Sequence, residues 1–220
     1  MATVSSDFIW RMEDVLDLYA EPYDVRYPVV CFDESPYQLL REVRPSLPMV
    51  PGHPGRDDYE YRRMGTCNLF MMVQPLAGWR HVEVTERRTA QDFAWCMKAL
   101  VDDHFPRAQL ISVVLDNLNT HSPAALYETF PPAEARRIVR LLDFRYTPKH
   151  GSWLNMAELE LAVLADQCLD RRLPDRASVC RAVAAWEATR NAAKATIQWQ
   201  FTVAKARTKL HHLYPEHHDS

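Results

Sequence analysis

Apolar residues recur along this chain with two different periods, and the changes between them outline its secondary structure. Spacings of three and four residues are typical of amphipathic helices, whereas short apolar runs and strict alternation are typical of strands. The helical pattern covers residues 7–20, 89–104, 132–142, 152–168, 176–195 and 203–213. The strand pattern covers residues 29–32, 60–76, 80–86, 109–115 and 144–147.

The order of these elements predicts an α/β fold with a mixed sheet covered by helices. Gly78 separates two strands, and Val82 and Val84 alternate with polar neighbours in the second, so we expect an antiparallel hairpin. Thr89 is placed to cap the helix that follows. Prolines concentrate at 45–55, where we expect an exposed loop.

The composition is that of an ordinary globular protein. The 220 residues are enough for one sizeable core or two small domains, and 47% are hydrophobic and 25% charged. No apolar run approaches the roughly 20 residues that span a bilayer, and the acidic N-terminus does not resemble a signal peptide. Five scattered cysteines without a CxxC pair indicate a reducing cytoplasm and argue against a structural zinc site.

Charge is distributed unevenly, although the net charge is only −3. Residues 1–60 carry five Arg against twelve Asp and Glu, whereas residues 171–210 carry nine Lys and Arg against two acids. This asymmetry has two interpretations: a face that binds a polyanion, or a solvated helical surface that pairs with the acidic N-terminal segment.

Two of the apolar runs that predict strands end on aspartate. The run 29–32 is followed by Asp33 and Glu34, and the run 111–115 is followed by Asp116 in the segment LDNLNTHSP. An Asp at such a position is often only a turn residue. Two carboxylates at the ends of adjacent core strands would repel each other unless a cation lay between them, and a divalent metal ion meets that need.

A third carboxylate lies at the beginning of the helix expected at 152–168. Ser152 is a plausible N-cap, and Glu158 then falls near the second turn, on the same face as Asn155. Glu160 lies about 200° further round the helix, so it cannot share a site with Glu158. Glu34 would point away from Asp33 on a continuous strand, which favours a supporting or structural role.

Three segments together resemble the catalytic motifs of the DDE transposases. They are 30-VCFDESPYQLL-40, 114-VLDNLNTHSP-123 and 146-YTPKHGSWLNMAELE-160, and the similarity is greatest to the insertion-sequence-630 branch of the mariner-like superfamily. The resemblance extends over nearly the whole chain, from about Phe8 to Pro215.

The resemblance implies an RNase H-like fold: a mixed five-stranded sheet flanked by helices, with a helical C-terminal region. It divides the chain into an N-terminal helix and linker (1–27), a catalytic core (28–168) and a basic helical extension packing on that core (169–220). Asp33, Asp116 and Glu158 would be both the catalytic residues and the ligands of two Mg²⁺ or Mn²⁺ ions. The reaction implied is phosphodiester hydrolysis at the ends of a DNA element, followed by transfer of the free 3′-hydroxyl into target DNA, commonly at TA.

Other residues of the same segments are candidates for lesser roles. Asn117, His121 and Asn155 would orient the carboxylates or a phosphate, although Asn117 and His121 equally suit turn or capping positions. Lys149, His150 and Trp153 would contact DNA, with packing beneath the loop as the alternative for Trp153. The six tryptophans as a group are expected mainly in the core.

The sequence departs from the family pattern because no helix-turn-helix segment precedes Asp33. Either a separate polypeptide supplies end recognition, or the sequence is a shortened copy, or it was cut from a longer one. The expected partners are terminal-repeat and target DNA and a second copy of the chain, in the bacterial cytoplasm and not on a membrane. Two alternative functions remain: a metal-dependent nuclease that does not join strands, and a non-catalytic remnant that binds DNA or a transposase.

Overall fold

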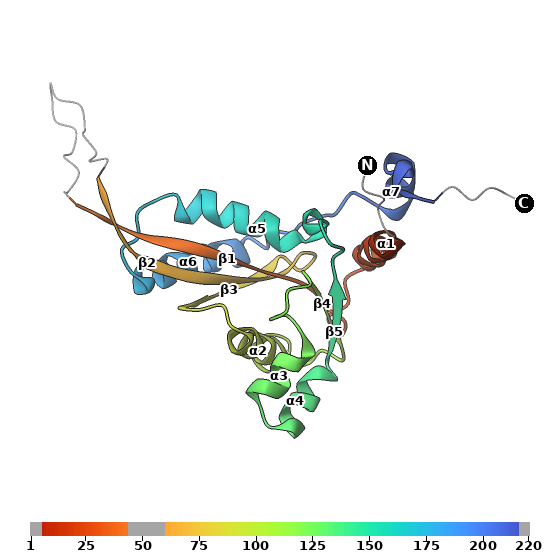
Figure 1. The fold of residues 1–220 in the computed structure, drawn as a ribbon, viewed down its shortest axis with the longest axis horizontal. Helices are drawn as coiled ribbons and strands as arrows, with labels where there is room; N and C mark the ends of the chain where they lie inside the picture. Colours follow the sequence, from red (N-terminus) through yellow and green to blue (C-terminus); the bar gives the residue numbers. More distant parts are fainter. Residues whose placement is uncertain (1–5, 44–59, 216–220) are drawn as a thin grey trace, which may run out of the picture.

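A single mixed sheet of five strands forms the centre of the protein (Figure 1). The computed structural model describes residues 6–43 and 60–215, and the proline-rich loop expected at 45–55 lies outside these ranges. Within them the strand order is β3-β2-β1-β4-β5. The strands are β1 (Val29–Glu42), β2 (Tyr61–Gln74), β3 (Trp79–Thr85), β4 (Ile111–Leu115) and β5 (Leu142–Tyr146).

The pairing of the strands follows from the connections between them. β1, β2 and β3 are antiparallel neighbours, so the expected hairpin across Gly78 is present. β4 pairs parallel with β1, and β5 pairs parallel with β4, because helices connect these strands. In the register of the parallel pair, Cys31 lies opposite Val114.

β1 continues far beyond the apolar run that predicted it, so the expectation that this strand stops at Phe32 was wrong. Residues 33–42 remain paired with β2, and Asp33 lies opposite Met71. Most side chains of this second half are partly or fully exposed. A continuous apolar run therefore marks only the part of β1 that is buried on both faces.

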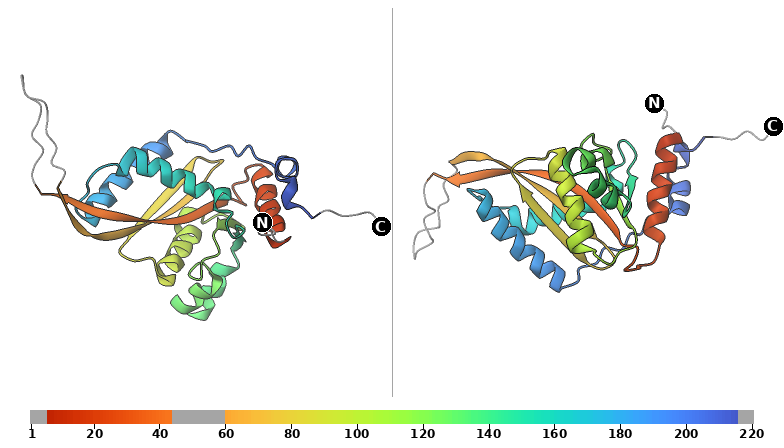
Figure 2. Two further views of the ribbon diagram at one scale, coloured as in Figure 1. Left: turned by 45° about the horizontal axis from the view of Figure 1, so that its top comes forward. Right: turned by 90° about the horizontal axis from the view of Figure 1, so that it is seen from below.

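Helices cover both faces of the sheet (Figures 1 and 2). One face packs against α2 (Ala90–Ala99), α3 (Pro123–Thr129) and α4 (Pro132–Val139). The other face packs against α1 (Ser6–Ala20), α5 (Met156–Leu164), α6 (Arg176–Ala192) and α7 (Val203–Lys209). α3 was not expected from the sequence, because its seven residues are too few to show a helical period.

Several expected helices are interrupted or extended by turns of other types. π-helical turns follow α2 at Leu100–His104 and α5 at Ala165–Leu169, and 3-10 turns lie at Ser152–Leu154 and His211–Leu213. The helix expected over 152–168 is thus three segments, because Asn155 has an extended conformation and caps α5. No helix in the described ranges is long and apolar enough to cross a bilayer.

Alternation along β1 separates the side chains into two cores. Cys31 belongs to the core under α1, α5 and α6, and Phe32 belongs to the core under α2 and α3. The same alternation places Asp33 on the α5 face and Glu34 on the α2 face. Asp33 thus lies within β1, and the alternation of side chains along the strand determines which face of the sheet carries it.

α1 is fixed to the body of the protein by polar contacts as well as by packing. Met12, Val15 and Leu16 are at most 1% exposed, and Asp14 forms an ion pair with Arg145 of β5. The hydroxyl of Tyr19 donates to the carbonyl of Leu154 at 2.8 Å.

α7 lies beside α1, as both views of Figure 2 show, and the two helices are joined by a salt bridge. Arg207 of α7 binds both carboxylate oxygens of Glu13, at 2.8 and 2.7 Å. This contact pairs a basic C-terminal helix with the acidic N-terminal segment. Such pairing is what the second interpretation of the charge asymmetry, a solvated helical surface, predicts. α6 contributes Val179, Val183 and Trp186 to the core to which α1 also belongs. The division of the chain into three parts at residues 27 and 168 stays a prediction.

Candidate active site

Asp33 and Asp116 lie at the same level of the sheet on neighbouring strands. Val29, Val30 and Cys31 pair with Ser112, Val113 and Val114, and the same register carried two residues further sets Asp33 beside Asp116. Both side chains are partly buried. The sequence prediction that two aspartates meet at this edge is supported, although β1 continues through the site while β4 ends there.

Glu158 reaches this pair from the first turn of α5, not from the second turn as expected. Asn155, rather than Ser152, is the N-cap: its Oδ1 accepts from the backbone N–H of Ala157 at 3.1 Å. Its Nδ2 donates to the carbonyl of Phe32 at 2.8 Å. Because Phe32 precedes Asp33, one buried amide fixes the beginning of α5 against the strand that carries the first carboxylate.

Asp33 lies within electrostatic reach of the other two carboxylates. Burial raises the pKa of Asp33 to about 7; a hydrogen bond from the N–H of Glu34 lowers it, and the charges of Glu34, Asp116 and Glu158 raise it. In the described ranges, Asp33 accepts only that 2.8 Å bond, and the Glu158 carboxylate accepts none. Most of the oxygen lone pairs of these two residues are therefore available to a ligand.

His121 joins Asp116 to Glu34 from the opposite face of the sheet. Its Nδ1 lies 2.7 Å from Oδ1 of Asp116, and its Nε2 lies 2.9 Å from Oε2 of Glu34. The ring is 1% exposed and contacts Phe93 and Phe32, with centroids 5.0 and 5.3 Å away. Burial lowers the pKa of His121, but the bonds to Asp116 and Glu34 outweigh it and raise the pKa to about 9.

Glu34, Asp116 and His121 could in principle hold a metal ion, since one donor atom from each lies within 4.8 Å of the others. Each ring nitrogen of His121 already faces a carboxylate, however, so the protonated ring forms an ion pair with both. The cluster is therefore better described as a pair of ion contacts through which the His121 cation orients Asp116. Sequence reasoning placed Glu34 and His121 separately and did not foresee that they meet, because they are 87 positions apart.

An open groove of about 500 Å³ runs beside Asp116. The groove is lined by Asn117, predicted to have a supporting role, and by Lys149 and His150, predicted to contact DNA. Lys149 and His150 are exposed, and His150 has a left-handed backbone with φ of 66°. The remaining lining residues are Asp7, Arg11, Leu118, Thr147, Pro148 and Ser152.

Trp153 does not line this groove. Its ring is 42% exposed and lies against Trp199 and Phe201, with centroids 6.5 and 5.7 Å away. Packing beside the loop, the alternative interpretation, describes this residue better than stacking in the groove. The expectation of a mainly buried set of tryptophans was wrong: Trp10, Trp95 and Trp153 are exposed, and among the six only Trp186 is buried.

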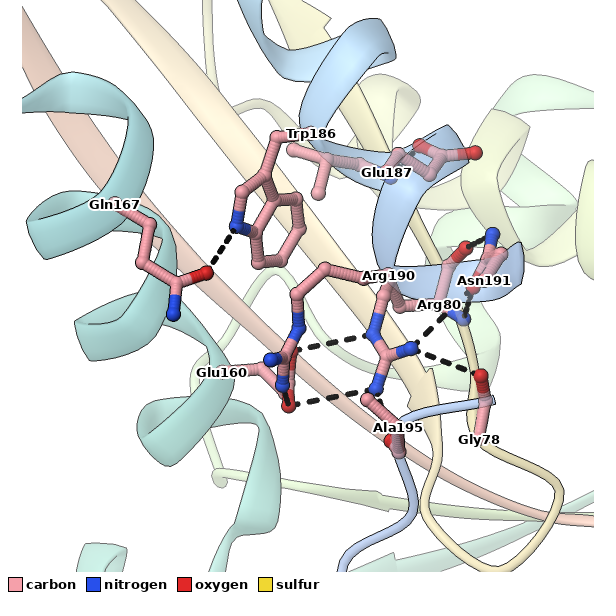
Figure 3. A network of polar contacts seen from close by, with 10 residues as sticks. Gly78, Arg80, Glu160, Gln167, Trp186, Glu187, Arg190, Asn191 and Ala195 are labelled. Carbon is pink, nitrogen blue, oxygen red and sulfur yellow. Dashed lines mark hydrogen bonds and ion pairs between the residues drawn. The ribbon is translucent and has the colours of Figure 1, made fainter. Parts of the chain in front are cut away.

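Glu160 points away from this site into a buried polar network (Figure 3). Glu160 is 1% exposed, and its carboxylate accepts hydrogen bonds from Arg80 of β3 and Arg190 of α6. Glu158 and Glu160 therefore belong to different sites, as the helical spacing predicted. Arg80 and Arg190 were not foreseen. Arg80 stands in an alternating strand where sequence gives no sign that a charged side chain is buried.

A family model described as "DDE superfamily endonuclease" matches residues 28–180 of this sequence. This is more than half of the chain and includes all three carboxylates. The chain belongs to this family. The resemblance to DDE transposases seen in the sequence motifs is thereby confirmed, whereas no curated protein matches the sequence.

Solved structures with the same fold come from transposase complexes. The Mos1 mariner paired end complex with Mn is 17% identical, with a TM-score of 0.58, over 90% of this chain and 61% of that one. The Mos1 strand transfer complex is 14% identical, with a TM-score of 0.57, over 83% and 53%. The pre-cleavage Mos1 transpososome is 14% identical, with a TM-score of 0.57, over 96% and 64%.

These similarities confirm the expected RNase H-like fold for this DDE endonuclease. The chain spans between about half and two thirds of the length of the solved chains it matches.

Proposed function

We propose that this chain is the catalytic part of a transposase and cleaves DNA phosphodiester bonds with divalent metal ions held by Asp33, Asp116 and Glu158. One observation carries the proposal: carboxylates from β1, from the end of β4 and from the first turn of α5 lie close enough together for the charges of Asp116 and Glu158 to raise the pKa of Asp33. Asp116 lines a groove that the exposed residue Lys149 also lines.

The donor set fits a hard divalent cation. Mg²⁺ and Mn²⁺ prefer oxygen ligands, and Asp33 and Glu158 have carboxylate oxygens without a partner in the described ranges. Three carboxylates without a cation among them are unfavourable, since like charges in a partly buried site repel. His121 pairs with the carboxylates of Asp116 and Glu34. It forms no ion pair with Asp33 or Glu158, so the charge of these two carboxylates is not neutralised by it.

Each residue then has a separate task. When two divalent ions are bound, they activate the attacking oxygen and stabilise the leaving one in an in-line displacement. Asp33 would hold a metal ion from the centre of the sheet, and Glu158 would supply a further carboxylate ligand from α5. His121 holds the Asp116 carboxylate in one orientation, and Asn155 keeps α5 close to β1. Lys149 and His150 would hold the DNA backbone in the groove.

The finer features of the reaction belong to the same proposal. Water would attack the phosphodiester at the end of the element, and the released 3′-hydroxyl would attack target DNA, with TA as the expected target. Support for joining, beyond hydrolysis, is the likeness of the fold to chains solved in a strand transfer complex. Action as a dimer and end recognition by a separate helix-turn-helix polypeptide complete the proposal.

Cleavage of a labelled DNA duplex in Mg²⁺ or Mn²⁺ tests the proposal. Metal-dependent nicking should be lost in Asp33→Asn, Asp116→Asn and Glu158→Gln. It should persist in Asp103→Asn and Glu128→Gln, which change exposed carboxylates away from the groove. Absence of nicking by the wild type at low salt and high protein concentration would overturn the proposal.

A second assay separates cleavage from joining. With a pre-cut element end, covalent insertion into a plasmid would establish a transposase, whereas nicking alone would identify a nuclease. Calorimetric titration with Mn²⁺ identifies a non-catalytic remnant, because such a protein would bind no metal at this site.

A further inference from the structure

The N-terminal helix forms one wall of the groove beside Asp116. Asp7 and Arg11, on the first turns of α1, line the groove together with Asp116, Asn117 and Lys149. The sequence motifs include neither Asp7 nor Arg11, and the family match begins only at residue 28. A cationic side chain therefore reaches the candidate active site from outside the segment that defines the family.

The guanidinium of Arg11 is held in place by Asp7. Its Nε donates to both carboxylate oxygens, at 3.0 and 3.1 Å, and the indole Nε1 of Trp10 donates to the same carboxylate at 3.1 Å. No described residue accepts a hydrogen bond from the two terminal amino groups of Arg11. Asp7 thus uses one edge of the guanidinium and leaves the other edge, with its parallel donors, free for an anion.

The position of Arg11 is fixed by the anchoring of α1. The buried Met12 and the ion pair between Asp14 and Arg145 attach this part of the helix to β5. The positive charge of Arg11 lowers the pKa of Tyr146, the last residue of β5, although burial raises that pKa overall. Arg11 therefore lies close to the end of β5, immediately before the loop that carries Lys149.

We propose that Arg11, held by Asp7, binds a backbone phosphate of the DNA duplex in this groove, which Lys149 also lines. The inference rests on the proposed DNA-cleaving function and adds α1 to the substrate-binding surface. A planar guanidinium with two free donors matches a phosphate, and the residues that line the groove include no Phe, Tyr or Trp. The contact positions the strand beside Asp116 and reads no sequence.

Salt dependence of DNA binding tests this contact. The affinity of full-length protein for a fluorescein-labelled duplex is measured by anisotropy from 50 to 200 mM salt, in Ca²⁺ as an oxygen-binding ion. Arg11→Ala should weaken binding about tenfold and reduce the slope of log K against log salt by about 0.9, the value for one lost phosphate contact. The change should be the same for duplexes of unrelated sequence.

Arg26→Ala is the matched control. Arg26 is likewise bound to an aspartate, Asp24, through its Nε at 3.2 Å. Its carbonyl accepts from Gln109, at the end of β4 opposite to Asp116. Arg26→Ala should leave the salt slope unchanged. Arg11→Lys should keep the slope, because the charge remains, but weaken binding, because the fixed pair of donors is lost.

The outcomes separate this inference from the proposed function. A wild-type protein that binds and cleaves DNA, with the same salt slope for Arg11→Ala, would overturn the role of Arg11 and leave the function intact. A wild type that neither binds nor cleaves DNA would overturn both. Equal thermal melting of wild type and Arg11→Ala shows that the comparison is between folded proteins.

Discussion

Arg80 and Glu160 form an ion pair in which both side chains are buried, two residues along α5 from the candidate catalytic Glu158 (Figure 3). Nε of Arg80 lies 3.2 Å from Oε2 of Glu160, and Arg190 of α6 reaches Oε1 at 2.6 Å. The remaining donors of Arg80 bind the carbonyls of Gly78 and Ala195. One carboxylate thus joins α5 to β3 and α6, and it fixes the rotation of the helix that presents Glu158.

Glu160→Gln should destabilise the protein strongly, because two guanidinium groups would remain in a low-dielectric interior without their anion. Removal of one partner from a buried pair typically costs about 3–5 kcal/mol of the free energy of unfolding. Urea denaturation measures this cost. Glu128→Gln, on the exposed surface of α3, should change the free energy of unfolding by less than about 0.5 kcal/mol. Equal stability of the two variants would show that Glu160 is not essential to the network.

Asn155→Ala should impair catalysis more than its effect on stability explains. The variant loses an N-cap, worth about 1 kcal/mol, and leaves the carbonyl of Phe32 without its donor, which costs a further 1–3 kcal/mol or so. Because the same amide holds α5 against β1, Glu158 would lose its fixed distance from Asp33. We expect a fall in kcat of at least about tenfold.

Thr89→Ala is the control for this prediction. Thr89 caps α2 through a bond from the N–H of Asp92, on the far face of the sheet. Its removal should also cost about 1 kcal/mol. Nicking by the two variants is compared at a temperature at which both are folded. If Thr89→Ala reduces kcat as much as Asn155→Ala does, the loss reflects stability and not the position of Glu158.

Periodicity in the sequence predicted the order of elements because apolar spacing is a local property. The hairpin of β2 and β3, the apolar strand β4 and the capping of α2 by Thr89 all follow from residues within a few positions of one another. The second half of β1 escaped prediction because it is held by pairing with β2, whose partner residues lie 19 to 38 positions away.

The candidate site shows the same limit more sharply. Asp33, Asp116 and Glu158 were found because motifs of a known family mark them. The contacts that hold them were missed: Glu34 with His121, Asn155 with Phe32, and Glu160 with Arg80 join residues 80 or more positions apart. Such pairs leave no periodic signal, and only the assembled sheet brings them together.

Glu34 and His121 should be coupled in a double-mutant cycle. His121→Leu removes the nearer cation of the Glu34 carboxylate, which is 4% exposed and otherwise faces Arg88 at 3.9 Å, and should cost about 3–5 kcal/mol of the free energy of unfolding. The double variant His121→Leu with Glu34→Gln removes that buried charge and should be more stable than His121→Leu alone. Denaturant unfolding of the four proteins gives the coupling energy. Additive effects would show that the two side chains do not interact.

The stability contributed by His81 should disappear at alkaline pH. Burial lowers the pKa of His81, but hydrogen bonds to Glu187 and Glu83 and their charges outweigh it and raise the pKa to about 9, from 6.5. A folded-state pKa above the unfolded value means that the stabilisation is complete below pH 6.5 and is lost as the pH rises to 9. One pKa unit corresponds to about 1.4 kcal/mol, so the contribution is at most about 3.5 kcal/mol before screening by solvent.

His81→Gln measures this contribution directly. The difference in free energy of unfolding between wild type and variant should be largest near pH 6 and should shrink toward pH 10. His104, whose ring centroid lies 4.5 Å from that of His81, has its pKa lowered by burial and by the charge of His81. Its own contribution therefore falls as the pH drops below 6.5, outside the window in which His81 acts. A difference between wild type and His81→Gln that stays constant from pH 6 to pH 10 would show that His81 is not held as a cation by Glu187.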